Sequence, residues 1–509
     1  MLIAVLVNDK VHAQKEYDVI RNNWIEFSDA PNALYHHFAR QACALLDKRA
    51  AAIKEIRSLS GWQQRQEYIR RSLQELVGPF PPKTALNAKT VRILKKEGYR
   101  IEHIIYESQP GFFVTASLYI PSVHGKNKLP AVIYCSGHAA EGYRSTVYQH
   151  VILNLVKKGF IVFAFDLVGQ GERLEYFDAA SGKSLVGGPV AEHSWAGAQA
   201  FITGSSQAKY MIWDGIRAVD YLLDRKEVDP QRIGITGRSG GGTQSAYIAA
   251  FDERIKAAAP ECYITSLSRI FQSIGPQDAE QNPGDAVLRG IDHADLLLVR
   301  APRPALMITT TRDMFSIEGA RETAKEVSGI YKAYKKEGNF SMVEDDAPHA
   351  STQKNREAMY AFFQKHLNNP GSSLDEETDT LTAQELQVTG TGQTATSLKS
   401  ETVFSLNRKQ AEQLEQRLQA SRNTLNSHLV NAVQSARKLS GYVPPLQTHE
   451  PVFTGRFRRD GYTIEKYFLQ GEGNYIIPYL LLKPDQPSHK ALLYLHPSGK
   501  QAEAAEGGE

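Results

Sequence analysis

Cysteine is scarce in this chain, and its scarcity excludes a small fold held together by disulfides. Cys43, Cys135 and Cys262 are the three cysteines among 509 residues. An odd number at such wide spacing cannot form a disulfide framework. Cys135 and Cys262 follow apolar runs, so we expect both to be buried as small hydrophobic side chains rather than to act as nucleophiles.

An excess of charge of one sign is also lacking. The 59 Lys and Arg residues nearly balance the 56 Asp and Glu residues, which leaves a net charge of +3. Such a balance does not favour a nucleic acid or an anionic membrane surface as a partner. With 42% hydrophobic and 23% charged residues, the chain has the composition of a globular protein, and its length predicts two or three domains.

Long hydrophobic runs are missing as well, so we predict no membrane-spanning segment. The apolar run 2–7, followed by Val11-His12-Ala13, resembles a shortened signal peptide that has lost its basic start. We therefore predict that residues 1–13 are the remnant of a signal peptide and that the protein is exported, to the periplasm or beyond the cell. A ragged N-terminus without a targeting role is the alternative.

Residues 14–98 form a predicted helical segment at the start of the chain. Apolar residues recur at helical spacing from 15 to 77, and the run Gly78-Pro79-Phe80-Pro81-Pro82 ends the helical pattern. Nothing in this segment points to chemistry, so we expect it to serve packing.

From Tyr99 onward the pattern changes to strands that alternate with helices. Two strands of period two, 99–106 and 112–120, are followed by continuous apolar runs at 130–135 and 160–165. Strands and helices then alternate up to a closing helix at 352–367. This order predicts an α/β domain over 99–370, with a mostly parallel sheet and helices on both faces.

The centre of this domain is the sequence Gly237-Arg238-Ser239-Gly240-Gly241. A predicted strand precedes it and a predicted helix follows it, which is the context of a nucleophile elbow. A serine hydroxyl needs a base to act as a nucleophile, and the amide of Gly240 would face the developing oxyanion. A plain glycine turn is an alternative. A phosphate-binding loop is another, although no G-K-[ST] follows.

Partners for Ser239 follow in the order expected of such hydrolases, acid first and histidine second. Asp313 ends a predicted strand and His349 precedes the closing helix. His349 would act as general base, and Asp313 would fix its tautomer. Other carboxylates remain candidates for the acid: Glu261, Glu318 and Asp345.

Further residues could complete the site. The backbone amide of His138, after the strand 130–135, is the predicted second oxyanion donor. Four side chains could line a pocket for a sugar or a carboxylate, although packing roles explain them equally well: Arg173, His193, Trp195 and Arg238. No cluster with metal-ligand spacing is visible, so the sequence implies no metal and no other cofactor.

Residues 99–367 resemble the acetylxylan-esterase-like bacterial branch of the α/β hydrolases. The resemblance is carried by the runs 213–222 and 233–242 and by Arg312-Asp313 and Pro348-His349. It implies the α/β-hydrolase fold and removal of acetyl groups from plant polysaccharides by exported proteins, with an esterified poly- or oligosaccharide as partner. Glucuronoyl esterases, in contrast, place an arginine just after the nucleophile, whereas Arg238 precedes it here.

The last third of the chain predicts a linker and an incomplete second copy of the domain. Residues 371–404 are rich in Gly, Ser, Thr and acidic residues, as in linkers. Residues 405–509 then repeat features of the first domain. Gly461-Tyr462 echoes Gly98-Tyr99, Pro484 matches Pro121, and 491–495 matches 131–135. This partial hydrolase-like repeat stops before any elbow.

The sequence thus favours a serine carboxylic-ester hydrolase that acts on esterified carbohydrate through a Ser-His-Asp triad and an acyl-enzyme. Three alternatives stay open: a uronic-acid methyl-esterase on pectin or glucuronoxylan, a serine peptidase of the prolyl-oligopeptidase type, and a non-catalytic binding protein. The peptidase family usually carries a β-propeller, and no blade-like repeat is visible. The sequence does not indicate the oligomeric state.

Overall fold

The computed structural model describes residues 17–20, 25–122, 128–445, 449–473, 475–488 and 490–502. The chain divides into two compact units: residues 43–423 form one, and residues 1–42 together with 424–509 form the other. The predicted signal-peptide remnant, 1–13, lies outside the described residues. Within them, no helix combines the length and the apolarity needed to cross a membrane.

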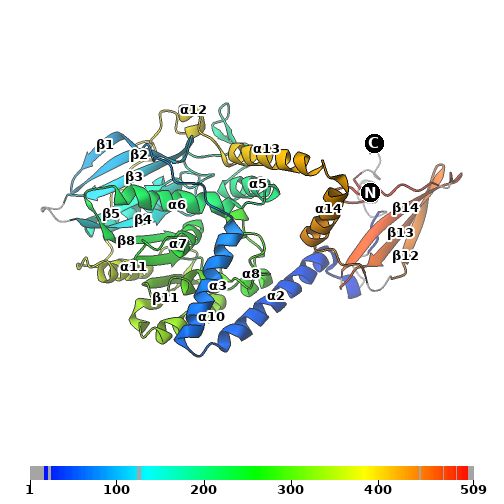
Figure 1. The fold of residues 1–509 in the computed structure, drawn as a ribbon, viewed down its shortest axis with the longest axis horizontal. Helices are drawn as coiled ribbons and strands as arrows, with labels where there is room; N and C mark the ends of the chain where they lie inside the picture. The colour runs from blue at the N-terminus through cyan, green and yellow to red at the C-terminus, as the bar shows by residue number, and fades with distance from the viewer. Residues whose placement is uncertain are drawn as a thin grey trace, which may run out of the picture. The chain divides into compact units, whose positions relative to one another are not determined.

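A nine-stranded sheet is the centre of the larger unit (Figure 1). Its strand order is β1-β2-β3-β5-β4-β8-β9-β10-β11. Strands β1, β2 and β3 are antiparallel to their neighbours. The other six strands, β5, β4, β8, β9, β10 and β11, run parallel to one another. The bounds of the strands are β1 (Lys89–Lys96), β2 (Tyr99–Gln109), β3 (Phe112–Pro121), β4 (Leu129–Cys135), β5 (Ile161–Phe165), β8 (Val228–Arg238), β9 (Ala257–Glu261), β10 (Ala305–Arg312) and β11 (Phe340–Pro348).

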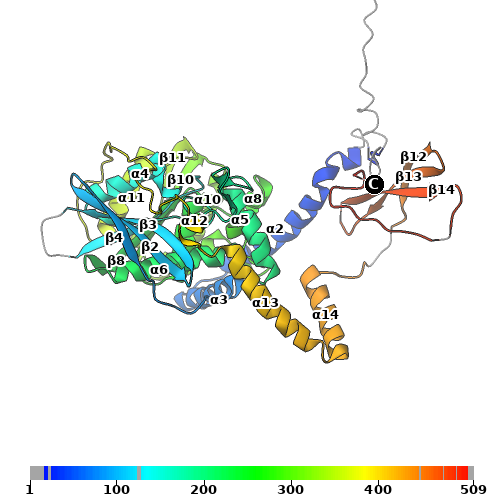
Figure 2. The ribbon, with the colours of Figure 1, turned by 90° about the horizontal axis from the view of Figure 1, so that it is seen from above.

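Helices cover both faces of this sheet because its central strands are apolar on both sides. One core cluster joins α4 (Thr146–Lys157) and α11 (Gln353–His366) to the sheet. The opposite face packs against α6 (Gln207–Leu223), α7 (Gly240–Phe251) and α10 (Ile317–Ala333). Figure 2 shows the same layers from above. The predicted α/β-hydrolase fold, with its mostly parallel sheet and helices on both faces, is confirmed.

The predicted N-terminal helical segment forms α2 (Ala33–Lys54) and α3 (Leu59–Val77). Trp62, Ile69 and Leu73 of α3 are buried in the same core cluster as α10. From α2, the Arg49 guanidinium lies 2.8 Å from Asp295 and 2.6 Å from Glu326. Helix α3 and the end of α2 are therefore an integral layer of the larger unit.

Between β5 and β8, the segment 174–204 contains a helix that the sequence pattern did not reveal. It comprises the short pair β6 (Phe177–Asp178) and β7 (Lys183–Ser184), followed by α5 (Pro189–Ile202). Three short elements follow β9: α8 (Leu267–Gln272), η4 (Ala279–Gln281) and α9 (His293–Leu298). The contacts between α5 and η4 build one wall of the site described below.

The prediction of a linker at 371–404 is wrong for most of its length. Leu381 and Leu386 are buried in the core, and Glu172 accepts hydrogen bonds from the amides of Val388 (2.6 Å) and Thr389 (2.7 Å). The scattered apolar residues of this segment fill the sheet edge without forming long elements, which is why composition alone suggested a linker. It leads through α12 (Thr394–Leu398) into α13 (Val403–Ser421).

The smaller unit contains α14 (Leu425–Ser440) and a three-stranded antiparallel sheet of β12 (Val452–Arg459), β13 (Tyr462–Gln470) and β14 (Ile476–Pro484). Its register repeats that of β1, β2 and β3 with every residue number raised by 363. Tyr462 pairs with Pro484 as Tyr99 pairs with Pro121. The register shift between Phe453 and Gly455 likewise matches the one between Thr90 and Arg92.

The segment 491–495, which the repeat predicts to match β4, is not a strand. Leu492, Leu493 and Leu495 are each more than four-fifths exposed. In the larger unit, β4 is held by β5 on one side and β8 on the other, and the described part of the smaller unit offers 491–495 neither partner strand. Without a neighbouring strand, the backbone N–H and C=O groups of an extended segment have no inter-strand hydrogen bonds to stabilise it as a strand.

We expect Arg49→Met to destabilise the larger unit by about 3 kcal/mol, because it leaves the largely buried Glu326 without its guanidinium partner and leaves Asp295 with Arg65 alone. Thermal or urea unfolding followed by circular dichroism measures this loss. Arg57→Met is the matched control, since Arg57 lies close by in the sequence and its side chain is exposed. Equal stabilities for the two variants would contradict the assignment.

Candidate active site

Ser239 occupies a strained turn between β8 and α7. Its backbone has φ 60° and ψ −123°, a conformation that costs a non-glycine residue about 1–3 kcal/mol. The Ser239 amide donates to the Glu261 carbonyl at 2.9 Å, and the Thr243 amide donates to the Ser239 carbonyl at 2.9 Å. These bonds fix the serine at the carboxyl edge of the sheet, as predicted for a nucleophile elbow.

The flanking glycines are required by close packing. A Cβ at Gly237 would lie 2.2 Å from the Cys135 carbonyl oxygen, and one at Gly241 would lie 2.0 Å from the same oxygen. A side chain at either position would push the end of β4 away from the elbow. The spacing of the glycines therefore reflects the contact between β4 and the start of α7.

His349 and Asp313 meet as the sequence predicts. The His349 Nδ1 lies 2.8 Å and 2.9 Å from the two carboxylate oxygens of Asp313. The carboxylate also accepts hydrogen bonds from the Phe315 amide (3.1 Å) and the Thr310 hydroxyl (3.0 Å). Burial is the largest single effect on the pKa of Asp313 and raises it, but the hydrogen bond and charge of His349 together with the hydrogen bonds from Phe315 and Thr310 outweigh burial and lower the pKa, so the carboxylate is ionised at neutral pH.

The other candidate acids have different partners. Glu318 is exposed and pairs with Arg321 at 2.7 Å. Asp345 lies 3.7 Å from Lys354. Glu261 is buried at the end of β9 and accepts a hydrogen bond from the Ser351 hydroxyl at 3.0 Å. Asp313 is thus the candidate whose carboxylate hydrogen-bonds to His349.

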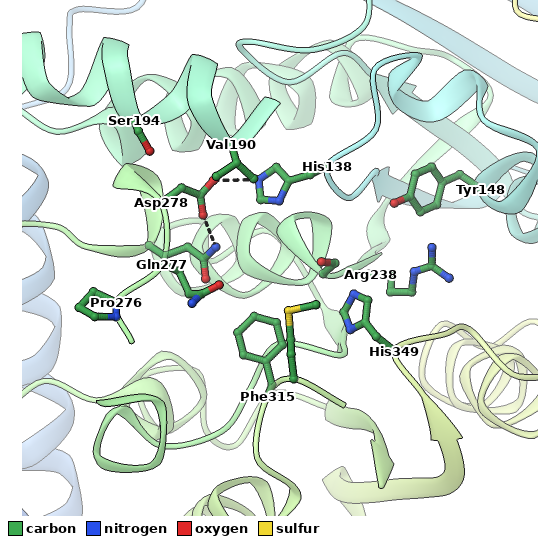
Figure 3. A pocket seen from close by; sticks show the side chains of 13 residues that line it. His138, Tyr148, Val190, Ser194, Arg238, Pro276, Gln277, Asp278, Phe315 and His349 are labelled. Atoms are coloured by element: carbon green, nitrogen blue, oxygen red, sulfur yellow. Dashed lines mark hydrogen bonds and ion pairs between the residues drawn. The ribbon is translucent and has the colours of Figure 1, made fainter. Parts of the chain in front are cut away.

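Ser239 and His349 line the same cavity, which has a volume of about 610 Å³. Figure 3 shows His349 and Phe315 on one side of it and His138 with Asp278 on the other. The remaining lining residues are Tyr148, Val190, Ser194, Arg238, Pro276, Gln277, Gln281 and Met314. The lining is polar on the side of Gln277 and Asp278 and has apolar surface beside His349.

The predicted oxyanion donors lie next to each other. Gly240 opens α7, so its amide is at the positive end of a helix. A Cβ at Gly240 would lie 2.7 Å from Cε1 of His138, which shows that the His138 imidazole packs directly on this glycine. The loop that carries His138 therefore borders the place where Gly240 would receive an oxyanion.

Of the four predicted substrate-binding side chains, only Arg238 lines the cavity. Its guanidinium lies over the Tyr148 ring, 5.2 Å from the centroid. The prediction is wrong for Arg173, which is buried in an ion pair with Asp214 at 2.7 Å. It is also wrong for Trp195, which is 58% exposed outside the cavity and packs on Tyr176.

The fourth, His193, belongs to a cluster that sequence reasoning missed. It is buried on α5, where it meets His138, Asp278 and Glu280. Burial opposes protonation of both imidazoles, but the two carboxylates outweigh it and raise the pKa of His138 to about 9 and that of His193 to about 10. The cluster joins three distant segments of the chain, so no short sequence motif reveals it.

A family model described as "Acetyl xylan esterase (AXE1)" matches residues 51–281. This match confirms the resemblance of the chain to acetyl xylan esterases. The chain is a carboxylic ester hydrolase. The matched range contains the elbow and His138 and ends at Gln281, so Asp313 and His349 of this esterase lie beyond it.

Two known proteins are similar to this chain, one in sequence and one in structure. A protein named "Putative hydrolase YtaP", from Bacillus subtilis (strain 168), is 23% identical over 318 residues, which cover 58% of this chain and 98% of that protein. The solved structure of "Methylesterase BT1017" is similar with a TM-score of 0.57 and 20% identity, over 74% of this chain and 81% of that one. This structural likeness supports the assigned fold.

Glu261 provides a test of the electrostatics near His349. Burial raises the pKa of its carboxyl to about 6, so the folded chain binds this proton more tightly than the unfolded chain. Its contribution to stability is therefore largest at low pH and is lost as the pH rises through 6, by roughly 2 kcal/mol in all.

We expect Glu261→Gln to abolish this loss, so that the variant gains stability relative to the parent between pH 4 and pH 8. Unfolding free energies measured across that range test this. The matched control is Glu337→Gln, at an exposed position, whose difference from the parent should stay constant. A constant difference for Glu261→Gln would contradict the raised pKa.

Proposed function

We propose that this esterase removes acetyl groups from plant polysaccharide, with acetylated xylan as the substrate class, through Ser239, His349 and Asp313. The observation that carries the proposal is the Asp313–His349 pair, which shares a cavity with a serine in an elbow conformation. The acetyl xylan esterase family model supports the choice of ester. Export of the chain remains a prediction from residues 1–13.

The proposed reaction has two halves. Ser239 Oγ attacks the acetyl carbonyl while His349 takes the hydroxyl proton, and Asp313 stabilises the imidazolium that forms. The amides of Gly240 and His138 would hold the oxyanion of the tetrahedral intermediate. His349 then protonates the departing sugar oxygen, which leaves an acetyl group on Ser239. Water activated by His349 attacks this acyl-enzyme and releases acetate.

A methyl-ester of a uronic acid is the second candidate substrate, because Arg238 brings a guanidinium to the cavity wall. A partly methylated pectin chain carries free carboxylates beside its esters, and a guanidinium pairs well with carboxylates. Stacking on Tyr148 holds Arg238 in place. The same contact also allows a packing role, so the two functions need a direct comparison.

We expect Ser239→Ala to lower kcat on 4-nitrophenyl acetate and on acetylated xylan by at least about a thousandfold, because the nucleophile is lost. Asp313→Asn should cost about ten-thousandfold through the wrong tautomer of His349. Ser245→Ala is the matched control, since Ser245 lies on the same helix and donates to the Gly242 carbonyl. Turnover by Ser239→Ala equal to that of the control would refute the triad.

We expect Arg238→Gln to separate the two ester classes. If the guanidinium binds uronates, kcat/KM should fall about tenfold or more on partly methylated pectin, which is the loss of about 1.4 kcal/mol of charge-assisted binding. It should change little on neutral acetylated xylo-oligosaccharides. Acetate and methanol release measure the two reactions. Equal losses on both substrates would assign Arg238 to packing against Tyr148.

A further inference from the structure

Four potential metal ligands converge in the wall of the cavity. The His138 Nε2 lies 3.2 Å from His193 Nδ1, 3.0 Å from Asp278 Oδ2 and 3.1 Å from Glu280 Oε1. The His193 Nδ1 lies 3.1 Å from Asp278 Oδ2 and 3.1 Å from Glu280 Oε2. One donor atom from each of the four residues lies within 4.8 Å of the other three.

We propose that His138, His193, Asp278 and Glu280 bind a divalent transition-metal ion, with zinc the best match. Zinc prefers four ligands in a tetrahedron at roughly 2.0–2.1 Å, which places the ligand atoms about 3.3 Å from one another. Five separations between these residues, in which Glu280 offers a different oxygen to each imidazole, lie at 3.0 to 3.2 Å and are close to that value. Two imidazoles with two carboxylates also form a donor set that suits zinc better than calcium or magnesium.

The arrangement of protons argues for a cation at this point. The His193 Nε2 donates to the Val168 carbonyl at 2.7 Å, since a carbonyl can only accept. If Nδ1 carries no proton, its lone pair faces the two carboxylates. If it does carry one, His138 Nε2 either turns its own lone pair to Asp278 and Glu280 or carries a proton that faces the proton of His193 at 3.2 Å. A dication removes both conflicts, because lone pairs and carboxylates alike would point at it.

Contacts around the four ligands orient them as in known metal centres. A metal-binding histidine commonly donates its other N–H to a carbonyl, which fixes the coordinating nitrogen, and the bond from His193 to Val168 does this here. Gln281 Nε2 donates to the second Asp278 oxygen at 2.5 Å. Glu280 is fully buried, and its Oε2 accepts no hydrogen bond within the described part of the chain, which leaves it available to an ion.

Two glycines let the ligand-bearing segments approach each other. Gly197 lies one turn after His193 on α5, and a Cβ there would be 2.2 Å from the Cβ of Ala279, between the two acidic ligands. A Cβ at Gly169 would be 2.9 Å from His193 Cδ2. Glycine thus occupies both positions at which a side chain would push the ligand-bearing segments apart.

Metal content of the full-length protein tests the proposal directly. The protein, purified without chelating resins and dialysed, should contain about one zinc ion per chain by mass spectrometry. A chromogenic chelator should compete for this ion, and restoring zinc should raise the unfolding temperature of the stripped protein. Absence of bound metal, together with no zinc uptake by the stripped but folded protein, would overturn the proposal.

Variants locate the site. Three variants should each lower zinc affinity at least about a hundredfold: Asp278→Asn, Glu280→Gln and His193→Ala. Loss of a residue that only orients a metal ligand already costs up to about a hundredfold in affinity, and loss of the ligand itself should cost at least as much. The matched controls are His36→Ala and Asp346→Asn, at exposed positions, which should keep the parental zinc content. Circular dichroism identifies variants that fail to fold. For those, chelator competition on the parent protein decides whether zinc is bound. Parental zinc affinity in folded Glu280→Gln would place the ion elsewhere.

Discussion

The strained backbone of Ser239 is the constraint on which the proposed active site depends. A serine at φ 60° is stable only if its surroundings prevent relaxation. The hydrogen bond to Glu261 ties it to β9, and the crowding of Gly237 and Gly241 against Cys135 ties it to β4. Because both neighbouring strands hold the turn, the sheet's free energy of folding maintains the conformation of the half-buried serine.

A buried ionic network ties the outer segments to the same edge of the sheet. Arg144 bridges Asp166 and Glu172, with 2.6 Å to each carboxylate. Glu172 in turn holds the backbone of Val388 and Thr389. This is why a segment with the composition of a linker lies against the domain: its amides supply the hydrogen bonds that a buried carboxylate needs.

The smaller unit shows how much of a fold can persist without its central strands. Sheet β12-β13-β14 keeps the register of β1-β2-β3 and the bulge between its first two strands, since an antiparallel meander makes its hydrogen bonds locally. The residues that match β4 remain exposed coil, because a central parallel strand needs neighbours that come from distant parts of a chain. This contrast supports the hypothesis that the strands at 452–484 repeat the first three strands of the larger unit's sheet.

The sequence by itself determined the elements with local causes: the alternation of strands and helices, the glycine elbow around Ser239, and the order of Asp313 and His349. Only the tertiary structure decided which carboxylate reaches His349 and which of the arginines faces the cavity. It also brought His138, His193, Asp278 and Glu280 to one point. Periodicity and turn chemistry act over a few residues, whereas these contacts depend on how α5 and η4 pack beside the end of β4.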